Sequence, residues 1–228
     1  MRVLELFSGT RSVGKCCDQL GWESISVDLI LPAVHQVDIM EFDYKQYPKN
    51  HFDIVWGSPP CTNYSNLKKC WYGRELNGFI YTKEQNEKEQ EEADKLVKKT
   101  FEIIEYFNPY LWFVENPQTG NLKNRTFMKD ITYYDVDYCM YSDWGYRKRT
   151  RIWTNKKDFN NLLCDNSGSC GNMIENRKHK LNVSKDVHTV GERKIKHKSD
   201  VGRDFGGGGN RLDRYRIPED LIYSLLLE

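Results

Sequence analysis

One cysteine of this chain lies in a setting that suits a nucleophile. Cys61 directly follows two prolines in the run "GSPPCTNYS" (57–65), just past the apolar run "FDIVW" (52–56). Because proline fixes φ and restricts the residue before it, we expect the thiol in a stiff loop at the end of a strand. A thiolate held in this way attacks electrophilic carbon. A cysteine alone is more often a packing residue, so its neighbours decide the interpretation.

Two carboxylates also lie at the ends of expected strands, as Cys61 does. Asp28 lies at the end of the run "SISVDL" (24–29), and Glu115 closes the run "YLWFVE" (110–115). The carboxyl ends of adjacent parallel strands meet at one edge of a sheet, where ligands of open α/β folds bind. We therefore expect Cys61, Asp28 and Glu115 near one another.

The first loop of the chain admits two interpretations. The run "GTRSVGKC" (9–16) nearly spells a nucleotide triphosphatase loop, but Cys16 replaces the Ser or Thr that would hold Mg²⁺. The second interpretation is a cofactor loop, in which Gly9 and a helix N-terminus lie close to a ligand. Asp28 follows Gly9 by 28 − 9 = 19 residues, where a carboxylate takes ribose hydroxyls. An ordinary strand-to-helix turn remains the alternative.

Strands that alternate with helices must position these residues. The expected strands are 2–7, 24–29, 52–56, 110–115, 133–141 and 149–155. Apolar residues between Val13 and Leu20 follow helical spacing. A second apolar helix face runs from Ala93 to Phe107, and the acidic stretch 84–94 forms the first turns of that helix. This alternation predicts an α/β fold with a doubly wound sheet.

The chain divides into three parts. Residues 1–155 form the expected cofactor-binding and catalytic domain. Residues 156–209 are polar and lack a sustained period, which predicts a small irregular recognition lobe or linker that ends in a flexible "GGGG". Residues 210–228 return as a C-terminal helix that starts near Pro218. The basic stretch 177–203 either contacts nucleic acid or is a solvated loop.

Composition limits the remaining functions. The formal net charge is +1, and the seven cysteines match no disulfide framework. We find no leader and no long apolar run, so we expect a soluble, reduced, intracellular monomer with no membrane partner, in the cytoplasm or in the host cell of a virus. Cys164 and Cys170, with His179 or His188, suggest zinc, but their five-residue gap exceeds the usual spacing. We expect no metal site and two reduced cysteines.

Taken in order, the motifs resemble those of the cytosine-C5 DNA methyltransferases, most closely the short branch found in phages and large viruses. The matching segments are "LELFSGTRSVGK" (4–15), "SVDL" (26–29), "VDIMEF" (37–42), "GSPPCTNYS" (57–65), "ENPQTG" (115–120), "YRKRTRIWTN" (146–155) and, loosely, "GGNRLDRYRIPEDL" (208–221). The resemblance implies a Rossmann-like, S-adenosylmethionine-dependent methyltransferase sheet and transfer of a methyl group to C5 of cytosine in DNA.

The resemblance also implies a catalytic set. Cys61 would add to C6 of cytosine, which makes C5 enamine-like, and Glu115 would protonate or hydrogen-bond N3. Arg149 and Arg151 would hold the base oxygen and phosphates, and we expect their charge to lower the pKa of the thiol. The base is inaccessible inside a duplex, so the substrate is DNA with a flipped cytosine or single-stranded DNA.

Two further sets follow from the resemblance. The residues expected to bind S-adenosyl-L-methionine are Phe7, Ser8, Gly9, Thr10, Arg11, Ser12, Asp28, Leu29, Asp38, Ile39, Pro59 and Asn210. Residues 62–82 would close over the flipped base, unless they form only a mobile surface loop. The residues expected to contact nucleic acid are Ser65, Lys68, Lys69, Arg74 and Arg147.

Departures from the family pattern keep two alternatives open. Thr10 and Arg11 replace the usual glycine after the "FSG" turn, Thr62 follows the cysteine in place of Gln, and Arg147 occupies the expected Gln position. One alternative is C5 methylation of cytosine in RNA. The other is an inactive methylase fold that only binds nucleic acid, with Thr10 and Arg11 blocking the cofactor. The short recognition segment predicts low sequence specificity.

Overall fold

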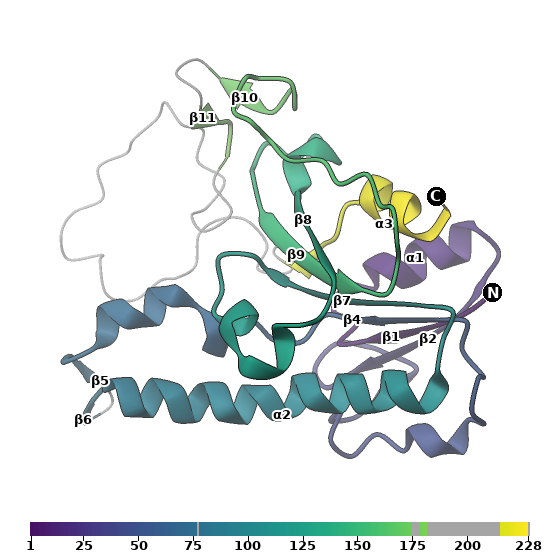
Figure 1. Cartoon of the computed structure of the whole chain (residues 1–228), viewed down its shortest axis with the longest axis horizontal. Coiled ribbons are helices and arrows are strands. Elements are labelled where there is room, and N and C mark those ends of the chain that lie inside the picture. The colour runs from purple at the N-terminus through teal and green to yellow at the C-terminus, as the bar shows by residue number, and fades with distance from the viewer. Residues whose placement is uncertain (77, 175–177, 182–214, 228) are drawn as a thin grey trace.

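A seven-stranded sheet forms the centre of the protein, with helices on both faces (Figure 1). The computed structural model describes residues 1–76, 78–174, 178–181 and 215–227. The strand order is β3-β2-β1-β4-β7-β9-β8. These strands are β1 (Arg2–Leu6), β2 (Glu23–Asp28), β3 (His35–Gln36), β4 (Ile54–Gly57), β7 (Leu111–Pro117), β8 (Tyr133–Asp137) and β9 (Arg149–Thr154).

The topology places the first loop beside the Pro-Cys loop. Strand β1 pairs in parallel with both β2 and β4. The chain after β1 continues to β2 on one side, and β4 lies on the other side, so the strand order reverses at β1. This is the switch point at which open α/β sheets bind ligands. Leu6 is in register with Gly57, and the amide of Ser58 donates to the carbonyl of Leu6 at 3.2 Å. The predicted α/β fold with a doubly wound sheet is confirmed, with β9 antiparallel to its neighbours β7 and β8.

The helices form two layers with separate cores. Helices α1 (Ser12–Gln19) and α3 (Glu219–Leu227) cover one face, where Val13 packs in one cluster with Leu221 and Leu225. Helix α2 (Lys83–Phe107) covers the other face through Val97 and Phe107. The short 3-10 helices are η1 (Tyr44–Gln46), η2 (Thr62–Tyr64), η3 (Asn66–Trp71), η4 (Leu122–Asn124), η5 (Thr126–Met128) and η6 (Tyr138–Met140).

Helix α2 starts earlier than its apolar face alone indicates. The hydroxyl of Thr82 accepts a hydrogen bond from the amide of Gln85 at 3.1 Å, which caps the N-terminus. The helix ends at Phe107 and is capped by Asn108, whose φ of 44° is left-handed. Burying each large apolar side chain of the stripe contributes about 2 kcal/mol. The acidic first half of the helix is therefore ordered and faces the loop that follows Cys61.

Several short elements differ from the sequence expectation. The expected strand 133–141 ends at Asp137, and the chain turns into η6. Two small hairpins, β5 (Glu75–Leu76) with β6 (Phe79–Ile80) and β10 (Met173–Ile174) with β11 (Lys178–His179), were not anticipated. Most of the expected lobe 156–209 and most of the basic stretch 177–203 lie outside the described residues, so the three-part division stays a prediction. Within the described ranges, no helix is both long and apolar enough to cross a bilayer.

Candidate active site

The loop that carries Cys61 is fixed to the neighbouring strand. Asn116, which is fully buried in β7, donates its side-chain amide to the carbonyl of Pro59 at 2.8 Å. The amide of Tyr64 donates to the carbonyl of Cys61 at 3.0 Å, which closes the turn into η2. The stiff loop predicted from the two prolines therefore also has a hydrogen-bonded anchor. Cys61 as a whole residue is exposed.

Glu115 is held between a phenol and an ammonium group. Its carboxylate is only 6% exposed, and it accepts a hydrogen bond from the hydroxyl of Tyr138 at 3.0 Å. The Nζ atom of Lys148 lies 3.5 Å from the same oxygen and 4.7 Å from the centre of the Tyr138 ring. Burial and the Glu115 carboxylate raise the pKa of Tyr138 well above its ordinary value, so the phenol keeps its proton.

Cys61 and Glu115 share one electrostatic environment. Loss of hydration raises the pKa of the Cys61 thiol, and the nearby Glu115 carboxylate raises it further. Lys148 acts in the opposite direction and lowers it. The expectation that arginine charge lowers the pKa of this thiol is wrong, because the cation that opposes the increase is Lys148 and the net shift is upward.

The arginines of β9 do not join Glu115. Arg151 binds the Asp135 carboxylate through two nitrogens at 2.7 and 2.8 Å, and its guanidinium lies 3.5 Å from the centre of the Tyr133 ring. Its register partner is Asn116, whereas Glu115 pairs with Ile152. Because side chains alternate along a strand, Arg151 lies on the opposite face of the sheet from Glu115.

The other two predicted arginines also lie apart from the Glu115 carboxylate. Arg149 is exposed at the start of β9. It lies two residues before Arg151, so both side chains belong to the same face of the sheet. Arg147 binds both oxygens of Asp137, at 2.9 and 2.7 Å. The structure gives Arg147 an ion pair with Asp137, and its contact with nucleic acid stays a prediction.

The first loop is tightly constrained. Phe7, Gly9 and Arg11 all have left-handed φ values between 52° and 56°. Asp28 accepts hydrogen bonds from the amides of Gly9 at 2.8 Å, Ile30 at 2.9 Å and Leu31 at 2.8 Å. The guanidinium of Arg11 turns back along α1 to Ser24, 3.3 Å away. The guanidinium of Arg11 is therefore directed to Ser24 and away from the Gly9 turn, which weakens the part of the blocked-cofactor alternative that rests on Arg11.

The N-terminus of α1 does not offer its amides to a ligand. The carboxylate of Glu5, only 3% exposed, accepts from the amides of Val13 at 3.1 Å and Gly14 at 3.0 Å. Burial raises the pKa of Glu5 to about 7. The sequence interpretation, in which these amides face the cofactor, is therefore wrong for Val13 and Gly14.

The groups that remain at this edge fit S-adenosylmethionine. Ser8 has a buried hydroxyl that finds no hydrogen-bond partner, next to the Gly9 turn. Asp28 and Asp38 supply carboxylates at the ends of β2 and β3, which suit ribose hydroxyls and an exocyclic amine. Leu29 is 59% exposed, an apolar surface that suits a flat adenine ring.

The segment before α3 returns to the first loop, as the last motif implies. The amide of Ile217 donates to the hydroxyl of Ser12 at 3.1 Å. Thr10 and Ser12 line a cavity of about 720 Å³ together with the stretches 139–144 and 216–220. Cys61 and Glu115 are not among its lining residues, so this cavity is not the base pocket. Asn210 lies outside the described residues.

The loop 62–82 is anchored by the acidic half of α2. Lys68 is only 7% exposed, and its ammonium contacts Glu89 at 2.6 Å and Asn63 at 2.7 Å. This buried pairing leaves Lys68 unsuited to the predicted phosphate contact. Ser65 uses its hydroxyl to cap η3, whereas Lys69 and Arg74 are exposed, and their contact with nucleic acid stays a prediction.

Sequence reasoning missed three kinds of residue in the site. Tyr138 carries no local signal, because its contact with Glu115 joins residues far apart in the chain. Lys148 precedes Arg149 within a basic run, and its position next to the arginine motif was the available signal. The third kind is a set of large apolar side chains that are exposed on the loop 62–82, namely Leu67, Phe79 and Ile80.

Comparisons with known proteins identify the family of this chain. The family described as C-5 cytosine-specific DNA methylase matches residues 28–200. A viral protein named "Probable DNA (cytosine-5)-methyltransferase", from Frog virus 3 (isolate Goorha), is 39% identical over 99% of both chains. This chain belongs to the C-5 cytosine-specific DNA methylases. The predicted family and enzyme class, DNA (cytosine-5-)-methyltransferase, are confirmed for this methylase.

Solved structures give a more distant likeness to the methylase. An E. coli structure described as a "putative DNA modification methyltransferase encoded within prophage" has a TM-score of 0.47 and 14% identity, over 68% of this chain. The Entamoeba histolytica methyltransferase EhMeth has a TM-score of 0.47 and 16% identity, over 72% of this chain. The methylase aligns with only 46% and 55% of those two chains, about half their length.

Proposed function

We propose that this methylase transfers a methyl group from S-adenosylmethionine to C5 of cytosine in DNA through a covalent bond between Cys61 and C6. The observation that carries the proposal is the anchoring of the Cys61 loop to β7 beside Glu115, because Asn116 donates to the carbonyl of Pro59 at 2.8 Å. The nearby Glu115 carboxylate also raises the pKa of the Cys61 thiol. A nucleophile and a proton carrier at one sheet edge are the two groups that this reaction needs from the protein.

The chemistry follows from the electron-poor C5 of cytosine. Addition of the Cys61 thiolate to C6 makes C5 enamine-like and places charge on N3, where Glu115 supplies a proton or a hydrogen bond. Tyr138 and Lys148 hold the Glu115 carboxylate in place for this step. After transfer, loss of the C5 proton and cleavage of the C6–sulfur bond regenerate the thiolate.

The cofactor is held at the ends of β1, β2 and β3. Asp28 fixes the Gly9 turn and would also take the ribose hydroxyls of the cofactor. Asp38 would lie beside the adenine with the backbone of Ile39, whose side chain is buried in the core, Leu29 would cover the ring, and the buried Ser8 hydroxyl would gain a partner. S-adenosylmethionine, once bound, supplies an electrophilic methyl group on its sulfonium sulfur.

The substrate presents cytosine outside the stack, either flipped from a duplex or in a single strand. Lys69 and Arg74 are exposed on the loop after Cys61 and suit phosphate contacts. Leu67, 72% exposed, offers an apolar surface for the gap that a flipped base leaves. The methylase acts as a monomer in this proposal.

The test is methyl transfer from labelled S-adenosylmethionine to duplex DNA, single-stranded DNA and tRNA. We expect label at C5 of cytosine in DNA with the unmodified chain and with the control Cys70→Ala, whose thiol is exposed outside the site. Cys61→Ala should lower the rate by about a thousandfold or more. Label on tRNA alone would overturn the proposal in favour of RNA methylation.

Sequence specificity is a separate expectation. The segment between the arginine motif and the last motif is short, so it presents few base-reading side chains. Bisulfite sequencing of a methylated plasmid should show many short sequence contexts. A unique site of about six base pairs would contradict this expectation and leave the proposed reaction intact.

A further inference from the structure

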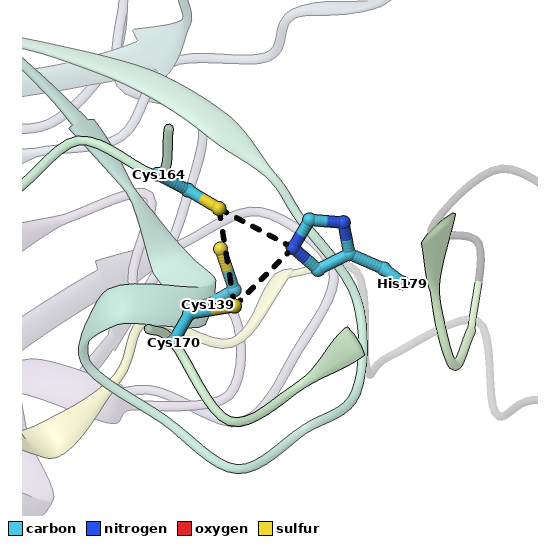
Figure 2. A group of neighbouring side chains, drawn as sticks. All are labelled: Cys139, Cys164, Cys170 and His179. Carbon is cyan, nitrogen blue, oxygen red and sulfur yellow. Dashed lines mark hydrogen bonds between the residues drawn. The ribbon is translucent and has the colours of Figure 1, made fainter. Parts of the chain in front are cut away.

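Four metal-binding side chains meet beside the end of β8, the edge strand of the sheet. They are the thiols of Cys139, Cys164 and Cys170 and the imidazole of His179 (Figure 2). Their ligand atoms all lie within 4.8 Å of one another. The sequence expectation of no metal rested on the gap between Cys164 and Cys170, and the structure supplies a further ligand, Cys139, from η6.

The distances among Cys164, Cys170 and His179 match three edges of a tetrahedral zinc centre. The sulfurs of Cys164 and Cys170 are 3.8 Å apart, and each lies 3.6 Å from Nε2 of His179. With Zn–S of about 2.3 Å and Zn–N of about 2.0–2.1 Å, a regular tetrahedron has S···S edges of about 3.8 Å and S···N edges of about 3.6 Å. A disulfide would instead need an S–S distance of about 2.05 Å.

We propose that Cys139, Cys164, Cys170 and His179 form a structural Zn²⁺ site. Thiolate and imidazole ligands favour zinc over the hard cations Mg²⁺ and Ca²⁺. Four protein ligands close the tetrahedron and leave no position for water or substrate, which marks a structural centre and not a catalytic one. Cys139 and Cys164 are buried and Cys170 and His179 are half-buried, so the centre lies just beneath the surface.

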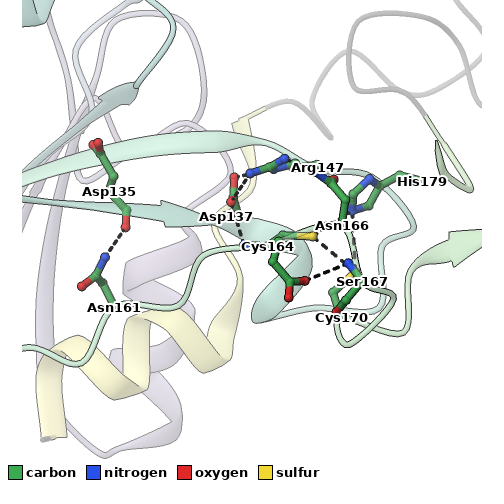
Figure 3. A network of polar contacts seen from close by, with 10 residues as sticks. Asp135, Asp137, Arg147, Asn161, Cys164, Asn166, Ser167, Cys170 and His179 are labelled. Carbon is green, nitrogen blue, oxygen red and sulfur yellow. Dashed lines mark hydrogen bonds and ion pairs between the residues drawn. The ribbon is translucent and has the colours of Figure 1, made fainter. Parts of the chain in front are cut away.

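Polar contacts hold the ligand-bearing segments in place. Asn172, only 2% exposed, donates to the carbonyls of Cys139 at 2.9 Å and Cys170 at 3.0 Å. Asp137 accepts from the amide of Cys164 at 2.9 Å and also binds Arg147 (Figure 3). Such outer contacts orient ligands and support metal affinity. Three of the four ligands are therefore positioned by the surrounding chain.

The segment after β9 needs such a cross-link, because it has little core of its own. Among its described residues, the buried apolar side chains are those of Phe159 and Cys164. Segments that bury little apolar surface depend on a metal or another staple for stability. A zinc ion bound by Cys139 would tie this segment to the end of β8. The site stands independently of the proposed methyl transfer.

The test is the metal content of the full chain, purified under reducing conditions with zinc present. We expect about one zinc per chain by mass spectrometry of the metal, and an X-ray absorption shell of three sulfurs and one nitrogen. Cys139→Ser and His179→Ala should each lose most of the zinc. Cys70→Ser, which removes an exposed thiol outside the cluster, should retain it.

A second measurement avoids dependence on how the variants fold. Adding Co²⁺ to the unmodified, metal-depleted chain should produce the visible absorption of tetrahedral cobalt with thiolate ligands, and zinc should remove it. Asn172→Ala should weaken zinc binding by about 10–100-fold. No zinc and no cobalt spectrum in the reduced chain would overturn the site. So would full zinc retention in Cys139→Ser, or a Cys164–Cys170 disulfide in the chain as purified.

Discussion

The reactivity of Cys61 should move in opposite directions when its two charged neighbours are neutralised. Lys148→Gln removes the cation that lowers the pKa of the thiol, and Glu115→Gln removes the carboxylate that raises it. Lys148 and Glu115 form an ion pair at 3.5 Å with side chains only 14% and 8% exposed, so their charges are weakly screened. We therefore expect slower alkylation in Lys148→Gln and faster alkylation in Glu115→Gln.

The magnitude follows from the position of the thiol. One unit charge on a neighbouring side chain interacts with a thiolate by a few kcal/mol at an effective dielectric of about 20. Cys61 is an exposed residue, so solvent screening reduces the effect to about 1 kcal/mol. That corresponds to about a fivefold change in thiolate population, and thus in alkylation rate, in each direction.

The assay is alkylation of Cys61 by iodoacetamide near neutral pH, followed by mass spectrometry of the peptide. Cys70 serves as an internal control, because it is an exposed thiol and both variants should leave its rate unchanged. Because the pKa of Cys61 is raised, its rate should keep increasing with pH into the alkaline range. Equal rates in both variants, or shifts in the same direction, would refute the electrostatic reasoning.

Three further predictions test the scaffold. Asn116→Ala leaves the carbonyl of Pro59 without its buried donor, so denaturant unfolding should show a loss of about 1–3 kcal/mol; an unchanged midpoint would contradict this. The pKa of Glu5 is raised from 4.5 to about 7, so the folded state retains a proton that the unfolded chain releases. Stability should therefore fall by up to about 3 kcal/mol as pH increases from 4.5 to 7, and Glu5→Gln should flatten that slope. Lys68→Met should lower the melting temperature, because it breaks the contact with Glu89, whereas Lys69→Met should weaken DNA binding in low salt. Weaker DNA binding in Lys68→Met with an unchanged melting temperature would show that Lys68 is the phosphate contact.

The sequence predicted the parts of the site that depend on local pattern. The prolines before Cys61 and the strand ends at Asp28 and Glu115 were sufficient to place these residues at one sheet edge. The facing direction of Arg151 was not predictable in the same way, because it depends on the register of β9 against Asn116 in β7. A motif specifies residue types, and pairing between distant strands then decides which face they occupy.

Two other features depended on contacts between distant segments. Tyr138 was expected in a strand because residues 133–141 alternate, but the chain turns into η6 and the phenol reaches Glu115. Cys139 belongs to the same turn and meets Cys164 and His179 only in the folded chain. Spacing rules consider neighbours in sequence, so they could not supply a ligand from a separate element.

Trapping with DNA that contains 5-fluorocytosine tests the central claim most directly. Fluorine replaces the C5 hydrogen, whose loss as a proton normally releases the enzyme. The bond between Cys61 and C6 should therefore persist. With S-adenosylmethionine present, we expect a stable protein–DNA complex, with the methylated base on the peptide that contains Cys61. Cys61→Ala should form none, and Cys70→Ala should form it normally. A complex mapped to another cysteine, or DNA binding and methyl transfer without any covalent complex, would contradict the account.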